Sequence, residues 1–210
     1  MDLRVLGHIR CVDPPVEVAG RQRALMGLLI VHAPEVVTVE RLVDALWPDE
    51  QPRNPASALH SRVSKLRRRL DDAGIRDVIL RQGAGYALAV SPDHIDARRF
   101  EQLADQARSL LADGDQPAAA ERAAAALALW TGDALEPLAH EPWARTEAAR
   151  LEELRLSTIE DLATARLALG QHASLVADLE RHVAAHPLRE SLRGRLMLAL
   201  YRSGRQADAL

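Results

Sequence analysis

The chain has little of the chemistry that several protein classes require. Cys11 is the one cysteine in 210 residues, so neither an internal disulfide nor a multi-cysteine zinc site can form. No apolar run approaches the roughly 18–20 residues of a membrane helix, and the first residues do not resemble a secretory signal. We therefore expect a soluble cytoplasmic protein with no membrane partner.

Aromatic residues and lysine are also scarce. Three Trp, two Tyr and one Phe are too few to fill a core, so the cores must be aliphatic. Of 27 basic residues only Lys65 is lysine. The hydrophobic content of 48% and the charged content of 27% are those of a folded chain, and the length suits one large or two modest domains.

The net charge of −3 conceals an uneven distribution. Residues 1–90 carry 13 Lys and Arg against 11 Asp and Glu, whereas residues 91–210 carry 14 against 19. A local basic surface is therefore possible in the first part. The acidic second part suits contacts with protein better than contacts with DNA.

Short strands and helices are expected to alternate over the first ninety residues. The alternation of apolar and polar residues from Leu3 to Val12 predicts one half-buried strand. Helices are expected over residues 23–32, over residues 39–46 with Thr38 as N-cap, and from Pro55 to about Leu70 with Asn54 as N-cap. Residues 79–90 indicate a hairpin whose turn Gly83 and Gly85 supply.

The helix that begins at Pro55 has two chemically distinct faces. Its apolar stripe has helical spacing and consists of Leu59, Val63, Leu66 and Leu70. At about 100° per residue, the opposite face carries Ser57, Ser61, Ser64, Lys65 and Arg68, while Arg62 lies beside the stripe. Between residues 53 and 69 there are six basic residues and no acid. Such a face can donate hydrogen bonds to phosphates and guanine edges, although a merely solvated face is the alternative.

The order of these elements favours DNA binding. An N-terminal sheet, three helices and a hairpin are typical of a winged helix, which lays one helix in the major groove and contacts phosphates with its wing. Arg81 and Gln82 lie on the first arm of the expected wing.

The second part of the chain is expected to be all helical. Helices are predicted over residues 97–112, 117–130, 143–169, 173–186 and 188–202. Gly170 and Gly204 are 34 residues apart, the tetratricopeptide period, and Gly114 fits an earlier copy that an insertion near residues 132–150 separates from them. Because the sequence stops inside an expected helix, we expect a piece of a longer chain.

Other possible sites are weaker. His182 and His186 have a spacing that can bind a metal, but no third ligand is evident, so a surface pair is the better interpretation. Cys11 is expected to be a buried small side chain, and Trp47, Trp130 and Trp143 are expected to anchor packing. No group of acid, base and nucleophile converges, and because the first expected strand begins at residue 3, we expect no receiver domain within this sequence.

Several segments together resemble the Streptomyces antibiotic regulatory proteins, the AfsR-like activators. They are residues 3–7 (LRVLG), 20–25 (GRQRAL), 39–47 (VERLVDALW), 63–70 (VSKLRRRL) and 85–86 (GY), and residues 141–144 and 196–209 resemble the same family's activation domain. The resemblance implies an OmpR/PhoB-type winged helix over residues 1–92 and a tetratricopeptide-like bacterial transcriptional activation domain over residues 93–210. The NTPase module and further repeats of the larger family members are missing here.

The resemblance also implies a function, with no catalytic site, metal or cofactor. It implies a transcription activator of antibiotic biosynthesis genes that binds direct repeats in double-stranded DNA as side-by-side protomers and recruits RNA polymerase with its principal sigma factor, at the nucleoid. The residues expected to contact DNA are Arg53, Asn54, Ser57, Ser61, Arg62, Ser64, Lys65, Arg68, Arg81 and Gln82. A repressor that uses the same DNA site and a protein-interaction or signal-sensing scaffold remain the alternatives.

Overall fold

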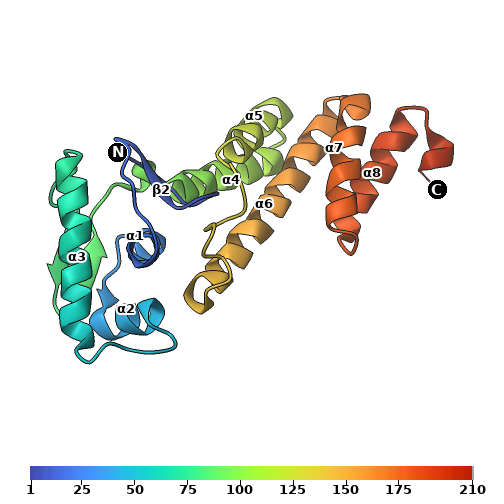
Figure 1. The fold of residues 1–210 in the computed structure, drawn as a ribbon. Coiled ribbons are helices and arrows are strands. Elements are labelled where there is room, and N and C mark those ends of the chain that lie inside the picture. The colour runs from blue at the N-terminus through green and yellow to red at the C-terminus, as the bar shows by residue number, and fades with distance from the viewer. Residues whose placement is uncertain (210) are drawn as a thin grey trace. The chain divides into compact units, whose positions relative to one another are not determined.

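The computed structural model describes residues 1–209, which form two compact units. One unit comprises Met1–Arg99 with Leu129–Glu152, and the other comprises Phe100–Ala128 with the chain from Glu153 onward. Helices dominate and the sheets are small and antiparallel (Figure 1), so the expected fold class is confirmed. Among the described residues, no helix combines the length and the apolar character needed to cross a bilayer.

The first unit contains the winged helix. Its helices are α1 (Arg21–His32), α2 (Val39–Leu46) and α3 (Pro55–Asp72), and the short 3-10 helix η1 (Pro92–His94) follows the wing. In one sheet β1 (Asp2–Arg4) pairs with β2 (Arg10–Asp13). In the other, β5 (Gly85–Leu88) lies between β3 (Val37–Thr38) and β4 (Ile79–Gln82).

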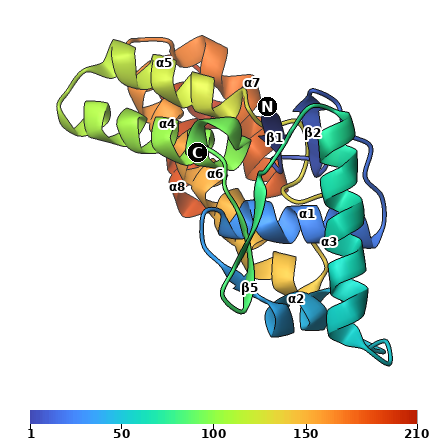
Figure 2. The ribbon, with the colours of Figure 1, turned by 90° about the vertical axis from the view of Figure 1, so that its left-hand side faces the viewer.

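Helix α1 is the centre of the first unit's core. Its side chains are buried along most of its length, and it packs against α2, α3 and β5 (Figure 2). The predicted caps of the next two helices are confirmed. The side-chain oxygen of Thr38 accepts a hydrogen bond from the Arg41 amide at 3.3 Å, and that of Asn54 accepts one from the Ser57 amide at 3.1 Å.

The prediction of one continuous strand from Leu3 to Val12 is wrong. The chain folds back between β1 and β2, and Gly7 has a φ of +137°. The carbonyl groups of the connecting residues accept hydrogen bonds from another segment of the same unit, including the amides of Thr131 at 2.8 Å and Leu135 at 2.7 Å. A Cβ on Gly7 would lie 2.3 Å from the Thr131 hydroxyl, so this close approach requires glycine.

Asp96 fixes the same connection from the other side. Its carboxylate is buried and accepts hydrogen bonds from the amides of Val5 at 2.8 Å, Leu6 at 3.0 Å and Ala97 at 2.8 Å. These bonds satisfy backbone N–H groups that a continuous strand would have left for a neighbouring strand. Desolvation raises the pKa of Asp96 to about 6, while the three backbone N–H groups act in the opposite direction.

Five long helices follow, as predicted, with ends displaced by up to three residues. They are α4 (Asp96–Ala112), α5 (Gln116–Leu127), α6 (Pro142–Ala168), α7 (His172–Ala185) and α8 (Glu190–Arg202), and α4 and α6 contribute residues to both units. The second unit's core includes Leu167 of α6, Leu179 of α7 and Leu192 of α8. In place of the α-helix expected at the end of the sequence, Gln206–Asp208 forms one turn of 3-10 helix, η2.

Three glycines end helices of the second unit in the same way. Gly114, Gly170 and Gly204 have φ values of +82°, +77° and +80°. After each, the next amide donates to the carbonyl five residues back, at 2.9, 3.0 and 3.0 Å respectively. This is the Schellman arrangement, which also ends α3 at Gly74, so the glycines terminate their helices while the helical repeat stays a prediction. The predicted insertion near residues 132–150 falls within the segment that belongs to the first unit.

Candidate nucleic-acid interface

Helix α3 presents its polar side to solvent because four apolar residues hold the other side in the core. Leu59, Val63, Leu66 and Leu70 are each at most 4% exposed, as the predicted stripe requires. Pro55 begins the helix after the Asn54 cap, and the helix ends at Asp72, two residues beyond the predicted end. Gly74 follows with a φ of +82°.

The ten residues expected to contact DNA all lie on the surface of the first unit. Those of α3 are exposed except for Arg62, which is half-buried beside the stripe. We call Ser57, Ser61, Ser64, Lys65 and Arg68 the basic face of α3. Arg53 and Asn54 are exposed at its N-terminal end, and Arg81 and Gln82 are exposed on β4. Nine of the ten are thus exposed and Arg62 is half-buried, while their contact with DNA stays a prediction.

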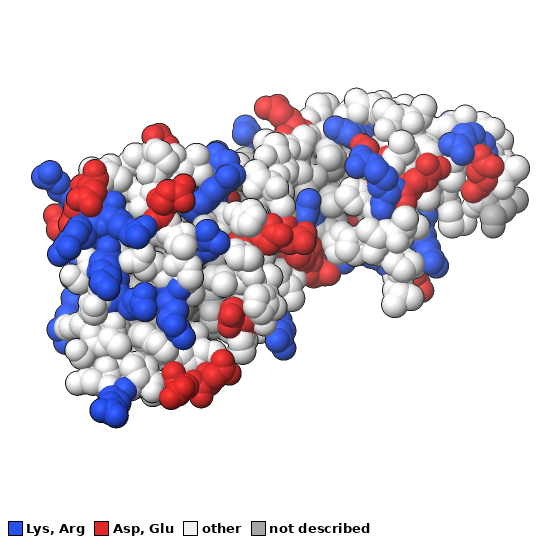
Figure 3. All heavy atoms as spheres, in the orientation of Figure 1, with Lys and Arg blue, Asp and Glu red and all other residues white. Residues whose placement is uncertain are grey.

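Positive charge on α3 is not neutralised by nearby acids. No Lys or Arg of α3 has a carboxylate oxygen within 4.0 Å among the described residues. Lys and Arg side chains gather over α3 in Figure 3. The two acids of the helix, Asp71 and Asp72, lie in its last turn. The middle of α3 therefore has a positive field that suits a polyanion.

The wing is the β4–β5 hairpin. Its turn is formed by Gly83, with a φ of +53°, and Ala84. Gly85 belongs to β5 instead of the turn, because it pairs with Thr38 of β3 and Gln82 of β4. A Cβ there would lie 2.2 Å from the Val37 carbonyl oxygen, so the position requires glycine. The predicted hairpin is confirmed, with this change in the role of its second glycine.

Three basic or aromatic side chains that we did not predict as part of the interface connect α3 to its surroundings. Arg67 donates two hydrogen bonds to the Ile79 carbonyl, at 3.0 and 2.6 Å, and Arg69 donates to the Glu17 carbonyl. His60 contacts Arg81, with 3.2 Å between Nε2 and a guanidinium nitrogen. The sequence contained one signal for this, since His60 and Arg67 are two helical turns apart on the same side of the stripe.

The other residues singled out in the sequence lie apart from this surface. Cys11 is buried, desolvation raises the pKa of its thiol, and the thiol donates to the Pro14 carbonyl at 3.2 Å. Trp47 and Trp130 are buried in the first unit, as expected for packing residues. His182 and His186 lie at the C-terminal end of α7, and no group of three metal-ligating side chains occurs within residues 1–209.

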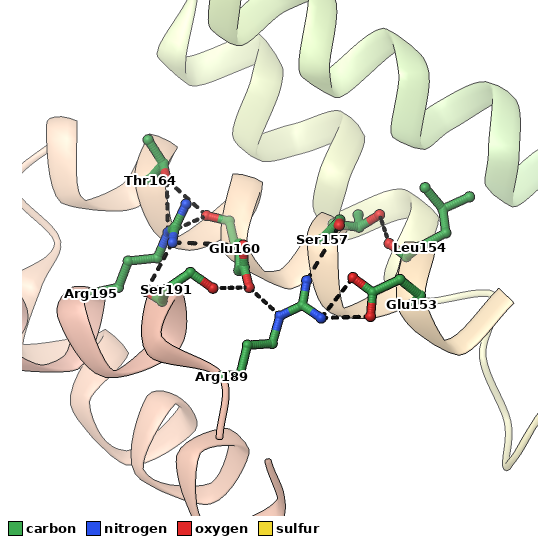
Figure 4. A network of polar contacts seen from close by, with 9 residues as sticks. Glu153, Leu154, Ser157, Glu160, Thr164, Arg189, Ser191 and Arg195 are labelled. Atoms are coloured by element: carbon green, nitrogen blue, oxygen red, sulfur yellow. Dashed lines mark hydrogen bonds and ion pairs between the residues drawn. The ribbon is translucent and has the colours of Figure 1, made fainter. Parts of the chain in front are cut away.

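A polar network in the second unit joins α6 to α8 and the residue before it (Figure 4). Arg189 donates to the carboxylates of Glu153, at 2.8 and 2.7 Å, and Glu160. Ser191 also donates to Glu160, and Arg195 donates to the Glu160 carbonyl at 3.0 Å. Hydrogen bonds from Arg189 lower the pKa of Glu153, and the two carboxylates raise that of Arg189. The network satisfies its own charges, which indicates a structural role.

Comparison with known families divides the chain in the order that the sequence predicts. Residues 13–88 match the family described as transcriptional regulatory protein, C terminal. Residues 95–210 match the family described as bacterial transcriptional activator domain.

Individual relatives agree with these matches. The regulatory protein AfsR of Streptomyces coelicolor is 39% identical over 191 residues, which cover 90% of this chain and 19% of AfsR. The regulatory protein DnrI of Streptomyces peucetius is 35% identical over 92% of this chain and 74% of DnrI. This chain thus spans about a fifth of the length of AfsR.

A solved structure has the same fold. It is that of Mycobacterium tuberculosis EmbR in complex with a low-affinity phosphopeptide. The match has a TM-score of 0.93 and 31% identity, and it covers 99% of this chain and 56% of the EmbR chain.

Proposed function

The chain belongs to the Streptomyces antibiotic regulatory protein family of transcriptional regulators, and from this premise we propose that it is a sequence-specific DNA-binding activator. In this proposal residues 1–92 bind DNA and residues 93–210 form the activation domain. The chain acts without a catalytic site, metal or cofactor, in the cytoplasm at the nucleoid.

One observation carries the proposal: the basic face of α3 is exposed, and no acid lies among the six basic residues from 53 to 69. Helix α3 packs on the core through its apolar stripe alone, so its polar side can enter the major groove while the domain stays folded. Lys65 and Arg68 can donate to phosphates or guanine edges, and the three serines can donate to phosphates. Arg53 and Asn54 lie where the N-terminal end of the helix approaches the DNA backbone.

The wing supplies the second contact in this proposal. Arg81 and Gln82 are exposed on β4, next to the turn of the hairpin. In a winged helix the hairpin contacts the phosphates beside the groove that the helix occupies. The helix then reads sequence while the wing fixes position.

In this proposal the activation domain links DNA binding to the start of transcription. We propose that two protomers bind direct repeats side by side and that the helical part recruits RNA polymerase with its principal sigma factor. The family description of residues 95–210 supports activation over repression. Membership of the Streptomyces antibiotic regulatory protein family supports targets in antibiotic biosynthesis.

The test is a binding-site selection with the full chain, followed by affinity measurements over a salt series. We expect two direct repeats about one helical turn apart, and an affinity that falls steeply with salt. Transcription of a template with the selected site, using purified polymerase, then distinguishes an activator from a repressor. Weak binding without sequence preference would contradict the proposal and favour a protein-interaction scaffold.

A further inference from the structure

Four side chains connect the wing to α3. The guanidinium of Arg81 on β4 lies 3.2 Å from Nε2 of His60 on α3. The His60 ring packs edge-on against Tyr86 of β5, with 6.0 Å between ring centroids and 66° between ring planes. Arg67, two turns along α3 from His60, lies 5.9 Å from the Tyr86 ring centroid. Arg81 and Tyr86 are directly opposite each other in the hairpin, so they lie on the same face of it.

The chemistry of this contact determines which ring nitrogen of His60 carries the proton. A guanidinium has several N–H donors and no acceptor, so Arg81 must be the donor. Nε2 of His60 therefore accepts and carries no proton, which places the ring's proton on Nδ1. Tyr86 is 2% exposed and fixed in the core, so it supports one side of the exposed His60 ring.

We propose that His60 is a positioning residue for DNA binding: it holds Arg81 of the wing beside α3, in the place from which Arg81 contacts a phosphate. This inference rests on the proposed function. An exposed arginine loses side-chain entropy when it binds a phosphate, and an arginine already held in place loses less. One donor is used by His60, and the planar guanidinium keeps further donors for the DNA backbone.

The experiment is a double-mutant cycle on the full chain with the selected DNA site. We expect R81A to weaken binding about five- to tenfold at roughly 0.1 M salt, as the loss of one phosphate contact does. H60A should weaken it about threefold, and H60A/R81A should bind no more weakly than R81A, because the two residues act as a unit. H60Q should restore affinity to within about twofold of the wild type, since the glutamine oxygen can also accept from Arg81.

Lys65 provides the matched control. It is exposed on the basic face of α3, outside the contact between α3 and the wing. The losses from H60A and K65A should therefore multiply in the double variant. Thermal melting of each variant verifies that it is folded.

A second readout does not involve DNA. Nitrogen-15 NMR of the His60 ring should show the proton on Nδ1 in the wild type, and R81A should shift the ring toward the Nε2–H form. This response shows that the bond between Arg81 and His60 forms, and the double-mutant cycle then shows that the bond acts on DNA binding.

Three results would overturn the inference. They are an H60A affinity equal to that of the wild type, losses for H60A and R81A that multiply, and a His60 ring unaffected by R81A. They leave the proposed function intact as long as K65A weakens binding. If the wild type shows no sequence-specific binding at all, the proposed function fails, and the inference fails with it.

Discussion

The arginines of α3 and a group of arginines in the second unit have opposite surroundings. Around α3, no carboxylate lies within 4.0 Å of a Lys or Arg of the helix in residues 1–209. In the second unit, Arg189, Arg195 and Arg205 each pair with a glutamate or aspartate. Lysine accounts for one of the 27 basic residues, so residue type alone does not distinguish the two surfaces. An arginine with a neighbouring acid forms a structural ion pair, whereas an arginine without one is available to a polyanion.

The largest expected effect tests the paired arginines. Arg189→Met removes the hydrogen bonds to Glu153 and Glu160 and leaves the largely buried Glu160 carboxylate without its closest cation. We expect the free energy of unfolding of the second unit to fall by about 2 kcal/mol. All three tryptophans lie in the first unit, so urea unfolding followed by circular dichroism should shift more than unfolding followed by tryptophan fluorescence.

Arg181→Met is the matched control, because its ion pair with Asp178 lies within one helix and the arginine side chain is 76% exposed. It should change the stability by at most about 0.5 kcal/mol. Equal losses for the two variants would break the comparison, since Arg189 would then be no more than a surface arginine.

The acids Asp96 and Glu153 differ in the same way, because one has a nearby arginine and the other, within residues 1–209, does not. An arginine lowers the pKa of Glu153, whereas Asp96 is surrounded by backbone and has its pKa raised from 3.8 to about 6. A raised pKa means that the folded state binds the proton more tightly, so the Asp96 contribution to stability is present below about pH 4 and is lost as the pH rises through about 6. We expect a loss of about 1.5 kcal/mol between roughly pH 5 and pH 7.5.

The measurement is urea unfolding of the first unit, followed by tryptophan fluorescence, across this pH range. Asp96→Asn cannot titrate, so the difference in slope between it and the wild type isolates Asp96 from every other group. Parallel curves for the two proteins would show that the three backbone N–H groups outweigh desolvation.

The unpaired cations of α3 are tested by binding. Lys65→Ala and Arg68→Ala should each weaken binding to the selected DNA site about tenfold at low salt, and the loss should shrink as salt rises if the contact is to a phosphate. Arg205→Ala removes an arginine that pairs with Asp208 at 2.7 Å and should leave the affinity unchanged. Equal affinities for wild type, K65A and R68A at low salt would exclude these residues from the interface.

Local pattern predicted α3 and its exposed face well, because both follow from one chain segment. The helix needs only its Asn54 cap, Pro55 and the apolar stripe to define which side faces the core. The same holds for the repeat glycines, since each terminates its own helix. These features depend on interactions within a few residues.

Features that depend on distant partners could not be predicted. The break between β1 and β2 arises because Thr131 donates to the Leu6 carbonyl from 125 residues away, and Asp96 caps the same connection. The bond between His60 and Arg81 depends on where the hairpin folds onto α3. A glycine inside an alternating strand and a histidine beside an apolar stripe were the two available signals.

Arg62 gives the smallest effect and decides where the basic face ends. It was predicted to contact DNA, yet it is half-buried beside the stripe of α3, where its stem can pack on the core. If packing dominates, Arg62→Ala should lower the stability of the first unit by about 0.5–1 kcal/mol while the folded protein binds DNA normally. Melting curves and affinities of the same samples separate the two roles. A lower affinity with an unchanged melting temperature would show that Arg62 contacts DNA, as Lys65 and Arg68 are expected to do. The DNA-contacting surface of α3 would then extend to the edge of the apolar stripe.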